Sequence, residues 1–229
     1  MRSPLALSFA VALLATMLSL SLGVLLASLL FQIGQPRPGR RFGIQLAELG
    51  DAVLSLPLVL PPTVLGYYLL TILGRHSPLG RLYESLLGIP LTFTPQAAVV
   101  AAMVSALPAI ARSSRAALRE VDPAYFRAAA SLGASPWRAL WTVGIPLCRR
   151  QIAAAAMLAF ARALGDFGVT LMIAGDIPGY TQTASLAVYD AVQAGRESDA
   201  LALIVPLSLF ALVVMYVVGR LQEPGAAKR

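Results

Sequence analysis

Between two strongly apolar segments lies the polar stretch Val121–Leu147, VDPAYFRAAASLGASPWRALWTVGIPL. Asp122 followed by proline is a helix start signal, because the carboxylate accepts free backbone amides and proline suits the first helical position. Ser135 followed by proline repeats that signal, and Gly133 between them suits the left-handed turn that closes many helices. This stretch, which we call the hook (residues 121–147), is therefore predicted to form two short helices joined at a glycine.

The composition predicts a membrane protein. Of the 229 residues, 58% are hydrophobic and only 13% are charged, whereas a soluble domain is about 25% charged. Several apolar runs approach or exceed the roughly 20 residues that a helix needs to cross a bilayer. We expect one all-α membrane domain over residues 1–229, with five spans near residues 5–33, 52–74, 97–110, 152–174 and 200–219.

The positions of the arginines predict an orientation. The net charge of +7 comes from basic residues that follow the first span, lie in or beside the hook, and follow the last span. The loops near residues 75–95 and 175–199 carry few basic residues and several acids. Because basic loops stay in the cytoplasm, we expect a cytoplasmic hook, within a loop of about 113–149, a cytoplasmic C-terminus and an outer N-terminus. Membrane orientation accounts for this basic charge, so no nucleic-acid partner is expected.

The second predicted span contains three prolines within SLPLVLPPTVLGYYLL. Each proline removes a backbone donor and disfavours helix at the residue before it. Irregular backbone at membrane depth is tolerated where protein or a water-filled cavity surrounds it. The pattern favours a broken helix that lines a path, and a kinked packing helix is the alternative. The candidate path residues here are Pro61, Pro62, Thr63 and Tyr67.

The fourth predicted span contains two opposite charges, Arg162 and Asp166, four residues apart. In a continuous helix this spacing places both side chains on one face, where they can pair. Ionisable groups inside a span are costly and suggest function by default. A role in the path and a structural ion pair between helices both remain open.

Catalytic motifs are missing from the sequence. The only lysine, Lys228, is followed by Arg229, so the Gly-Lys-Ser/Thr of a phosphate-binding loop does not occur. The single Cys148 and the single His76 cannot form a metal cluster. We expect no enzymatic activity, no metal and no cofactor bound by this chain. Energy for any active process would have to come from elsewhere: from protons, with Asp166 as the candidate relay, or from an ATP-hydrolysing partner docked on the hook.

The hook resembles the cytoplasmic loop of ABC-importer permeases. That pattern begins Glu-Ala-Ala, has a glycine four residues beyond the second alanine, and ends in a hydrophobic residue and proline. The alanine pair, the glycine and the final Ile-Pro match, whereas Arg127 occupies the Glu position with the opposite charge. The resemblance implies that coupling helices seat on the ATPase subunit through Arg127, Ala128, Ala129, Gly133, Ala134, Ser135, Pro136, Ile145 and Pro146.

From about residue 50 onward the chain looks like the molybdate-transport permeases, through SLPLVLPPTVLGYYLL, FARALGDFG, IPGYTQT and LAVYDAVQAG, with Asp166 where these carry Glu. The resemblance implies a type I ABC importer transmembrane domain in the bacterial plasma membrane, surrounded by lipid, that imports an oxyanion by alternating access. It implies a homodimer, two cytoplasmic subunits that hold ATP and Mg, and an extracytoplasmic oxyanion-binding protein. Molybdate is the expected oxyanion, with tungstate or sulfate as alternatives. A proton-coupled secondary transporter is the alternative of a different class.

Overall fold

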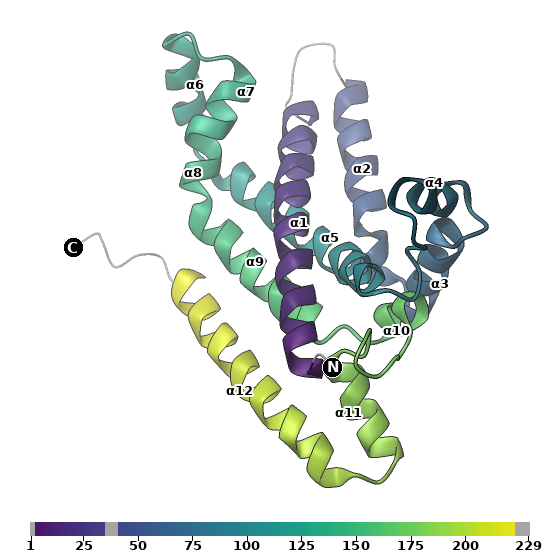
Figure 1. Ribbon diagram of the computed structural model, residues 1–229. Helices are drawn as coiled ribbons and strands as arrows, with labels where there is room; N and C mark the ends of the chain where they lie inside the picture. Colours follow the sequence, from purple (N-terminus) through teal and green to yellow (C-terminus); the bar gives the residue numbers. More distant parts are fainter. Residues whose placement is uncertain (1–2, 35–40, 223–229) are drawn as a thin grey trace.

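The computed structural model describes residues 3–34 and 41–222, and all regular elements in these ranges are helices (Figure 1). In chain order they are α1 (Pro4–Ile33), α2 (Arg41–Val59), α3 (Pro62–Leu73), α4 (Pro78–Leu87), α5 (Pro95–Glu120), α6 (Pro123–Ser131), α7 (Pro136–Ala139), the π-helical turn η1 (Leu140–Gly144), α8 (Ile145–Leu147), α9 (Arg149–Leu164), α10 (Gly168–Ala174), α11 (Ala184–Gln193) and α12 (Glu197–Gln222). The prediction of an all-α chain is confirmed.

Helices α1, α5 and α12 are each long and apolar enough to cross a membrane by themselves. Two further candidates are bent pairs: α2 with α3, at 112°, and the segment from α7 to α8 with α9, at 72°. Counting each bent pair as one span brings the total to five, the predicted number. The predicted helix over residues 152–174 is wrong in detail, because the chain divides there into α9 and α10.

Local sequence signals explain where many helices begin. Ser3, Ser77 and Thr94 each precede a proline and accept a backbone N–H at the start of α1, α4 and α5. A capping oxygen satisfies one of the amides that a helix leaves without a partner, and the proline has no amide to satisfy. The same device opens the two helices of the hook, described below.

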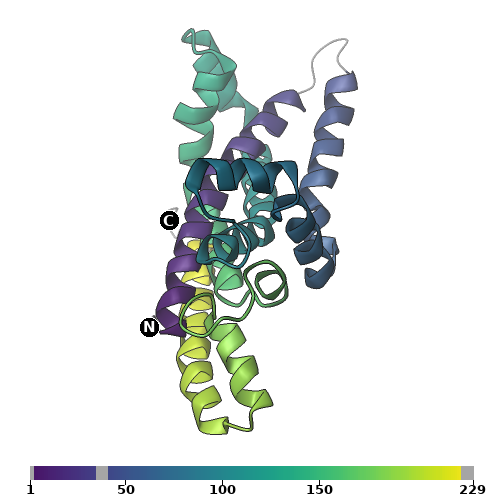
Figure 2. The ribbon, with the colours of Figure 1, turned by 45° about the vertical axis from the view of Figure 1, so that its right-hand side comes forward.

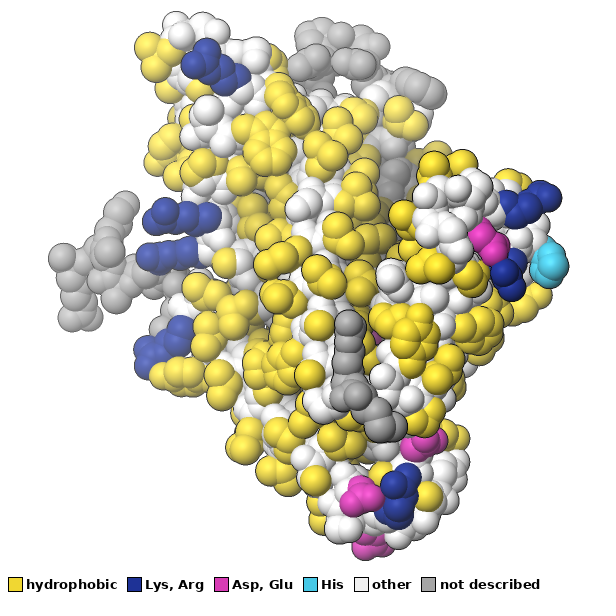
Figure 3. Space-filling model, viewed as in Figure 1, with side chains coloured by type: hydrophobic (Ala, Val, Ile, Leu, Met, Phe, Trp, Pro, Cys, Tyr) yellow, Lys and Arg dark blue, Asp and Glu magenta, His cyan; other side chains and the backbone are white. Residues whose placement is uncertain are grey.

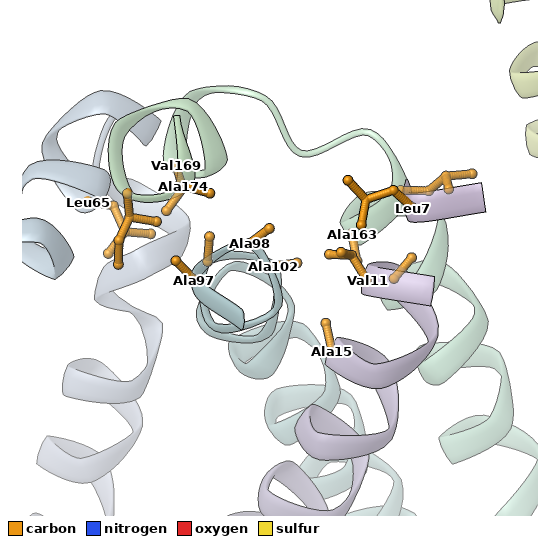
Figure 4. Packing of buried hydrophobic residues seen from close by; sticks show 14 residues of the cluster. Leu7, Val11, Ala15, Leu65, Ala97, Ala98, Ala102, Ala163, Val169 and Ala174 are labelled. Carbon is orange, nitrogen blue, oxygen red and sulfur yellow. The ribbon is translucent and has the colours of Figure 1, made fainter. Parts of the chain in front are cut away.

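Small side chains allow the core helices to approach closely. The cluster around α5 joins α1 on one side to α3 and α10 on the other, as Figure 4 shows. Ala12 and Ala15 of α1 and Ala98 and Ala102 of α5 are almost fully buried. Alanine and glycine are typical of helix contacts in membranes, where close approach of backbones supplies van der Waals energy. Helix α5 is therefore the central element against which the other helices are positioned.

The two ends of the molecule differ in what they carry. The hook lies at one end, near the C-terminal end of α1, whereas the hairpin of α11 and α12 lies at the other, near the N-terminus (Figures 1 and 2). In the view of Figure 3, basic side chains lie at the hook and farther along the same edge of the molecule, and acidic side chains lie together with a few basic ones by the α11–α12 hairpin and beside α4. The hook and the C-terminal end of α1 therefore lie at the same end of the molecule.

Candidate functional site

The first helix of the hook begins and ends as the sequence predicts. The backbone N–H of Ala124 donates to Asp122 Oδ1 at 2.8 Å, so Asp122 caps α6. Gly133 follows the helix with a φ of +79°, in the left-handed region. Ala134 N–H donates to the carbonyl of Ala129 at 3.0 Å across this glycine. These bonds form the C-terminal cap that is common where glycine ends a helix.

The second helix of the hook is longer and less regular than predicted. Ser135 accepts a hydrogen bond from Arg138 N–H at 3.3 Å, which confirms it as the cap of α7. The helix then widens into the π-helical turn η1 and continues as α8. Pro146 explains the widening, because its ring clashes with the carbonyl four residues earlier in a regular helix. Such π-turns occur often at functional sites.

The surface of the hook carries large apolar side chains. Leu132 at its tip is 89% exposed, and Tyr125 is 54% exposed. Trp137 and Trp141 are also exposed, with ring centroids 6.0 Å apart. No residue of α6 is buried. Clustered exposed apolar side chains on a polar segment are typical of an interaction surface.

The residues predicted for coupling lie on different faces of the hook. Ala128 and Ala129 line a shallow depression of about 460 Å³ together with Tyr125 and Leu132. Arg127 instead lines a larger cavity of about 620 Å³ between the hook and the ends of α1 and α5. The predicted coupling residues thus belong to two faces of the hook, one outward and one toward the membrane helices. The sequence pattern did not distinguish these two faces.

The inner cavity is where the hook meets the membrane helices. Gln32 at the end of α1 donates through Nε2 to the carbonyl of Pro136 at 2.8 Å. Phe31 contacts Phe126 of α6, with ring centroids 5.9 Å apart. Ile145 packs on a buried cluster of α5 and α9 residues. The hook is therefore attached to α1 and α5 but keeps a cavity between itself and them. Besides Arg127, two arginines line that cavity, Arg115 and Arg119.

The second span is broken where the prolines predicted it. Residues 60 and 61 interrupt the helix, and α2 and α3 meet there at 112°. Pro61 and Pro62 are exposed in the single chain, as are Thr63 and Tyr67. No side-chain hydrogen bond caps the start of α3 in the described residues. The break therefore presents backbone and polar side chains on the surface of one subunit.

A second interruption lies directly against the first. A Cβ added to Gly168, at the start of α10, would lie 2.8 Å from Cβ of Pro62, and one added to Gly66 would lie 2.6 Å from Cβ of Met172. Only glycine permits this approach of α3 and α10. The two broken segments thus pack directly against each other.

The predicted pairing of Arg162 with Asp166 on one helix face is wrong. Helix α9 ends at Leu164, so Asp166 lies beyond the helix, and no ion pair with Arg162 forms in residues 3–34 and 41–222. The Asp166 carboxylate instead accepts two hydrogen bonds from Thr170 in the first turn of α10, one from its N–H at 3.0 Å and one from its hydroxyl. Ser185 donates to the Asp166 carbonyl at 2.7 Å. The hydrogen bonds of Asp166 therefore hold the second break, and Arg162 lies exposed on α9.

The sequence did not identify the buried ion pair between Arg115 of α5 and Asp51 of α2. The Arg115 side chain is 4% exposed, and its Nη1 lies 2.5 Å from Asp51 Oδ2. The available signal is its place among Ala111, Ser114 and Leu118 on the buried face of α5, where an arginine requires a partner.

The segment after α10 holds two acidic groups, Asp176 and Asp190, close together. Asp176 Oδ1 is buried without a hydrogen-bond partner in the described chain, and Gln182 donates to Asp190 at 2.9 Å. Burial, followed by the nearby charge of Asp190, raises the pKa of the Asp176 carboxyl above its ordinary value. The folded state therefore disfavours ionised Asp176.

The substitution Asp176→Asn is expected to stabilise the protein slightly at neutral pH. A carboxyl whose pKa is raised by folding adds stability only when it is protonated, so wild-type stability should rise as the pH falls from 7 toward about 4. The variant should lack this rise and melt up to about 2–4 °C higher at pH 7. Thermal unfolding in detergent from pH 5 to 8 measures both. The exposed Glu197→Gln should keep the wild-type pH dependence; an unchanged profile in Asp176→Asn would contradict the assignment.

The chain has several apolar spans and is therefore a multi-pass membrane protein. Its two interrupted segments in contact and its protruding hook give it the architecture of a transporter subunit. Residues 19–224 match the family of binding-protein-dependent transport system inner membrane components, and the chain belongs to this family.

Similar sequences and structures agree with this membership. The molybdenum transport system permease protein ModB of Escherichia coli is 38% identical over 226 residues, which cover 97% of this chain and 95% of that protein. ModB of Azotobacter vinelandii is 38% identical over 88% of this chain and 90% of that protein. Among solved structures, the inward-facing MetNI methionine ABC transporter is similar with a TM-score of 0.66 at 18% identity, covering 95% of this chain and 94% of that one. The last similarity concerns the fold, and it confirms the expected ABC-transporter transmembrane domain.

Proposed function

We propose that this chain is the membrane-spanning permease subunit of an ATP-driven importer for molybdate. The observation that carries the proposal is the 38% identity, over nearly the whole of both chains, to a permease named for molybdenum transport. The interrupted α2–α3 span and the hook lie within the matched region, so the similarity includes the segments that would perform transport. Tungstate and sulfate are related tetrahedral oxyanions, and the test below includes both.

The hook is proposed as the docking site of a separate cytoplasmic ATPase subunit, which holds ATP and Mg. Its exposed Leu132, Tyr125 and two tryptophans supply an apolar surface that a partner would cover. Arg127, Arg119 and Arg138 lie on or beside the hook and favour the cytoplasmic side of the membrane. The proposed orientation therefore places the hook where an ATPase can reach it.

A homodimer is proposed because a single chain leaves its broken span uncovered. Pro61 and Pro62 are exposed, and Tyr67 is 55% exposed. Non-helical backbone at membrane depth requires protein or a water-filled cavity around it. A second copy facing α2 and α3 would enclose the two breaks and create a path between the subunits. The uncapped start of α3 would then present backbone N–H groups to a passing anion.

The proposed mechanism is alternating access. Closure of the ATPase pair would move the two hooks together, and the attached ends of α1 and α5 would transmit that motion to the spans. An extracytoplasmic binding protein would deliver the oxyanion at the α11–α12 end. Hydrolysis of ATP would then reset the hooks. In this scheme the single domain of residues 1–229 supplies the path for the oxyanion and the coupling to the ATPase. The ATPase supplies the energy, and the binding protein captures the oxyanion.

Co-purification with the ATPase, followed by uptake into proteoliposomes, tests the proposed function. We expect a stable complex and ATP-dependent uptake of molybdate when the binding protein is supplied. Competition with tungstate and sulfate identifies the preferred oxyanion. Accumulation driven by a proton gradient alone, without the ATPase, would overturn the proposal in favour of a secondary transporter.

Removal of the hydroxyls at Thr63 and Tyr67 tests the proposed path. Thr63→Val combined with Tyr67→Phe is expected to reduce the rate of oxyanion uptake about tenfold, because hydrogen bonds to charged groups are worth about 1.5–3 kcal/mol. Docking of the ATPase should be unchanged, since both residues belong to α3, which lies away from the hook helices α6 and α7 (Figure 1). Thr71→Val is the matched control, because the Thr71 hydroxyl bonds to the carbonyls of its own helix. Wild-type uptake in the double variant would remove these residues from the path.

A further inference from the structure

Arg115 is a buried charge at the point where three helices converge. Its Nη1 lies 2.5 Å from Asp51 Oδ2 and donates to the carbonyl of Ala47, also on α2, at 3.3 Å. A Cβ on Gly34, just after α1, would lie 3.3 Å from Arg115 Nη2. The side chain of Arg115 is 4% exposed, whereas that of Asp51 is 32% exposed. The guanidinium thus joins α5 to α2 and packs beneath the end of α1.

The ion pair is incompletely bonded. Asp51 Oδ1, Arg115 Nε and the neighbouring Ser114 hydroxyl are buried without a hydrogen-bond partner in the described residues. Arginine and carboxylate commonly form two parallel hydrogen bonds, but here one Nη makes the close contact. Arg115 also lines the cavity of about 620 Å³ beneath the hook. The pair therefore has unused bonding capacity and free space beside it, which are the conditions for a second arrangement.

The two helices joined by this pair lead to the two parts that the importer must couple. Helix α5 ends at Glu120 and continues directly into the hook. Helix α2 ends at the break where α3 turns away by 112°. An ion pair between α5 and α2 thus connects the hook to the broken span through two rigid elements.

We propose that Arg115 and Asp51 are a positioning pair that transmits displacement of the hook to the α2–α3 break, and that the pair changes its bonding between the two states of the transport cycle. This inference rests on the proposed function, because it assigns a role within ATP-driven transport. The alternative is a static clamp that only stabilises the fold. If the pair only stabilises the fold, any attraction between α2 and α5 would suffice. If the pair transmits displacement, the particular geometry of the two charged groups is required as well.

Paired substitutions separate the two roles. Asp51→Asn alone leaves a buried arginine without its counter-charge, so it should lower both stability and uptake. Replacing both partners by apolar residues of similar volume, in Asp51→Leu/Arg115→Met, removes that penalty, and such replacements often preserve stability. We expect the double variant to melt near the wild-type temperature and to bind the ATPase. Its oxyanion uptake per ATP hydrolysed should nevertheless fall about two- to thirty-fold, the range for residues that carry coupling between sites.

The measurement uses the full complex with ATPase and binding protein in proteoliposomes. Uptake and ATP hydrolysis are determined in parallel, with molybdate as the probe. Arg112→Gln is the matched control, because Arg112 is an exposed arginine one turn earlier on α5, and its ratio should equal that of the wild type. A wild-type ratio in the double variant would show that the pair is only a clamp, and would overturn the inference.

Two further outcomes are distinguishable. If the double variant does not fold, the variant Asp51→Glu distinguishes the two roles, because it keeps the negative charge and moves it by one methylene. A lowered ratio then supports transmission, and an unchanged ratio overturns it. If the wild-type complex takes up no oxyanion with ATP, the proposed function itself fails, and the inference fails with it.

Discussion

Substitution of Gly66 by alanine is expected to lower the melting temperature of the protein by about 5–10 °C and to abolish most oxyanion uptake. The added Cβ would lie 2.6 Å from Cβ of Met172 and 3.3 Å from Cα of Val169. Neither atom is the end of a flexible side chain, so the two helices must separate. Overpacking of this kind costs about 1–3 kcal/mol, and 1 kcal/mol corresponds to about 2–4 °C for a chain of this size.

The matched control is Gly219→Ala on α12, where an added Cβ meets no atom within 4 Å. This variant should be as stable as the wild type or slightly more stable, because alanine favours helix over glycine by about 1 kcal/mol. Thermal unfolding in detergent and the yield of folded protein compare the two. Gly66→Ala/Met172→Gly should recover part of the loss by removing the opposing Cβ. Equal stability of Gly66→Ala and Gly219→Ala would contradict the close packing of α3 on α10.

This contact matters for function because it joins the two interruptions of the membrane domain. In the first turn of α10, Thr170 N–H donates to the carboxylate of Asp166, which precedes the N-cap residue Phe167. No side-chain hydrogen bond caps the start of α3 in the described chain. A side chain of the protein itself therefore bonds to the start of α10, whereas the start of α3 remains available to an outside partner. The asymmetry supports a path along α3 and a structural role for Asp166.

Features determined by neighbouring residues were predictable from the sequence. Asp122 and Ser135 act as caps because a short polar side chain and a following proline suffice, whatever the rest of the fold does. Gly133 takes the left-handed turn for an equally local reason. The break in the second span follows from the missing amides and the steric effect of its prolines. The structure at these positions could be predicted without knowing how the helices pack.

Features that depend on contact between distant segments were not predictable in this way. The spacing of Arg162 and Asp166 indicates a pair only if the helix continues, but the helix stops at Leu164 and Asp166 bonds to the first turn of the next helix. Arg115 and Asp51 are far apart in sequence, so their pairing requires the packing of α2 on α5. Arg127 could be assigned to the hook, but the face on which it lies depends on how the hook folds back over α1.

Substitution of Gly133 by valine is expected to weaken docking of the ATPase about thirty-fold with little change in the melting temperature of the permease. At a φ of +79° a branched side chain is strained by about 2 kcal/mol, and 1.4 kcal/mol corresponds to a tenfold change in affinity. The strain is purely conformational, because a Cβ at this position meets no atom within 4 Å. It would open the cap formed by the Ala134–Ala129 hydrogen bond and change the angle between α6 and α7.

The comparison of Gly133→Val with Gly133→Asn isolates this cause. Asparagine adds a side chain of similar size but adopts the left-handed conformation readily, so the hook should keep its shape and bind the ATPase nearly as the wild type does. Both variants leave Leu132 and the exposed aromatic side chains in place, and only the geometry that presents them differs. The dissociation constant of the purified permease and ATPase measures the effect. Equal weakening by valine and asparagine would show that the partner contacts the glycine itself, whereas wild-type affinity for both would place the docking surface away from the turn.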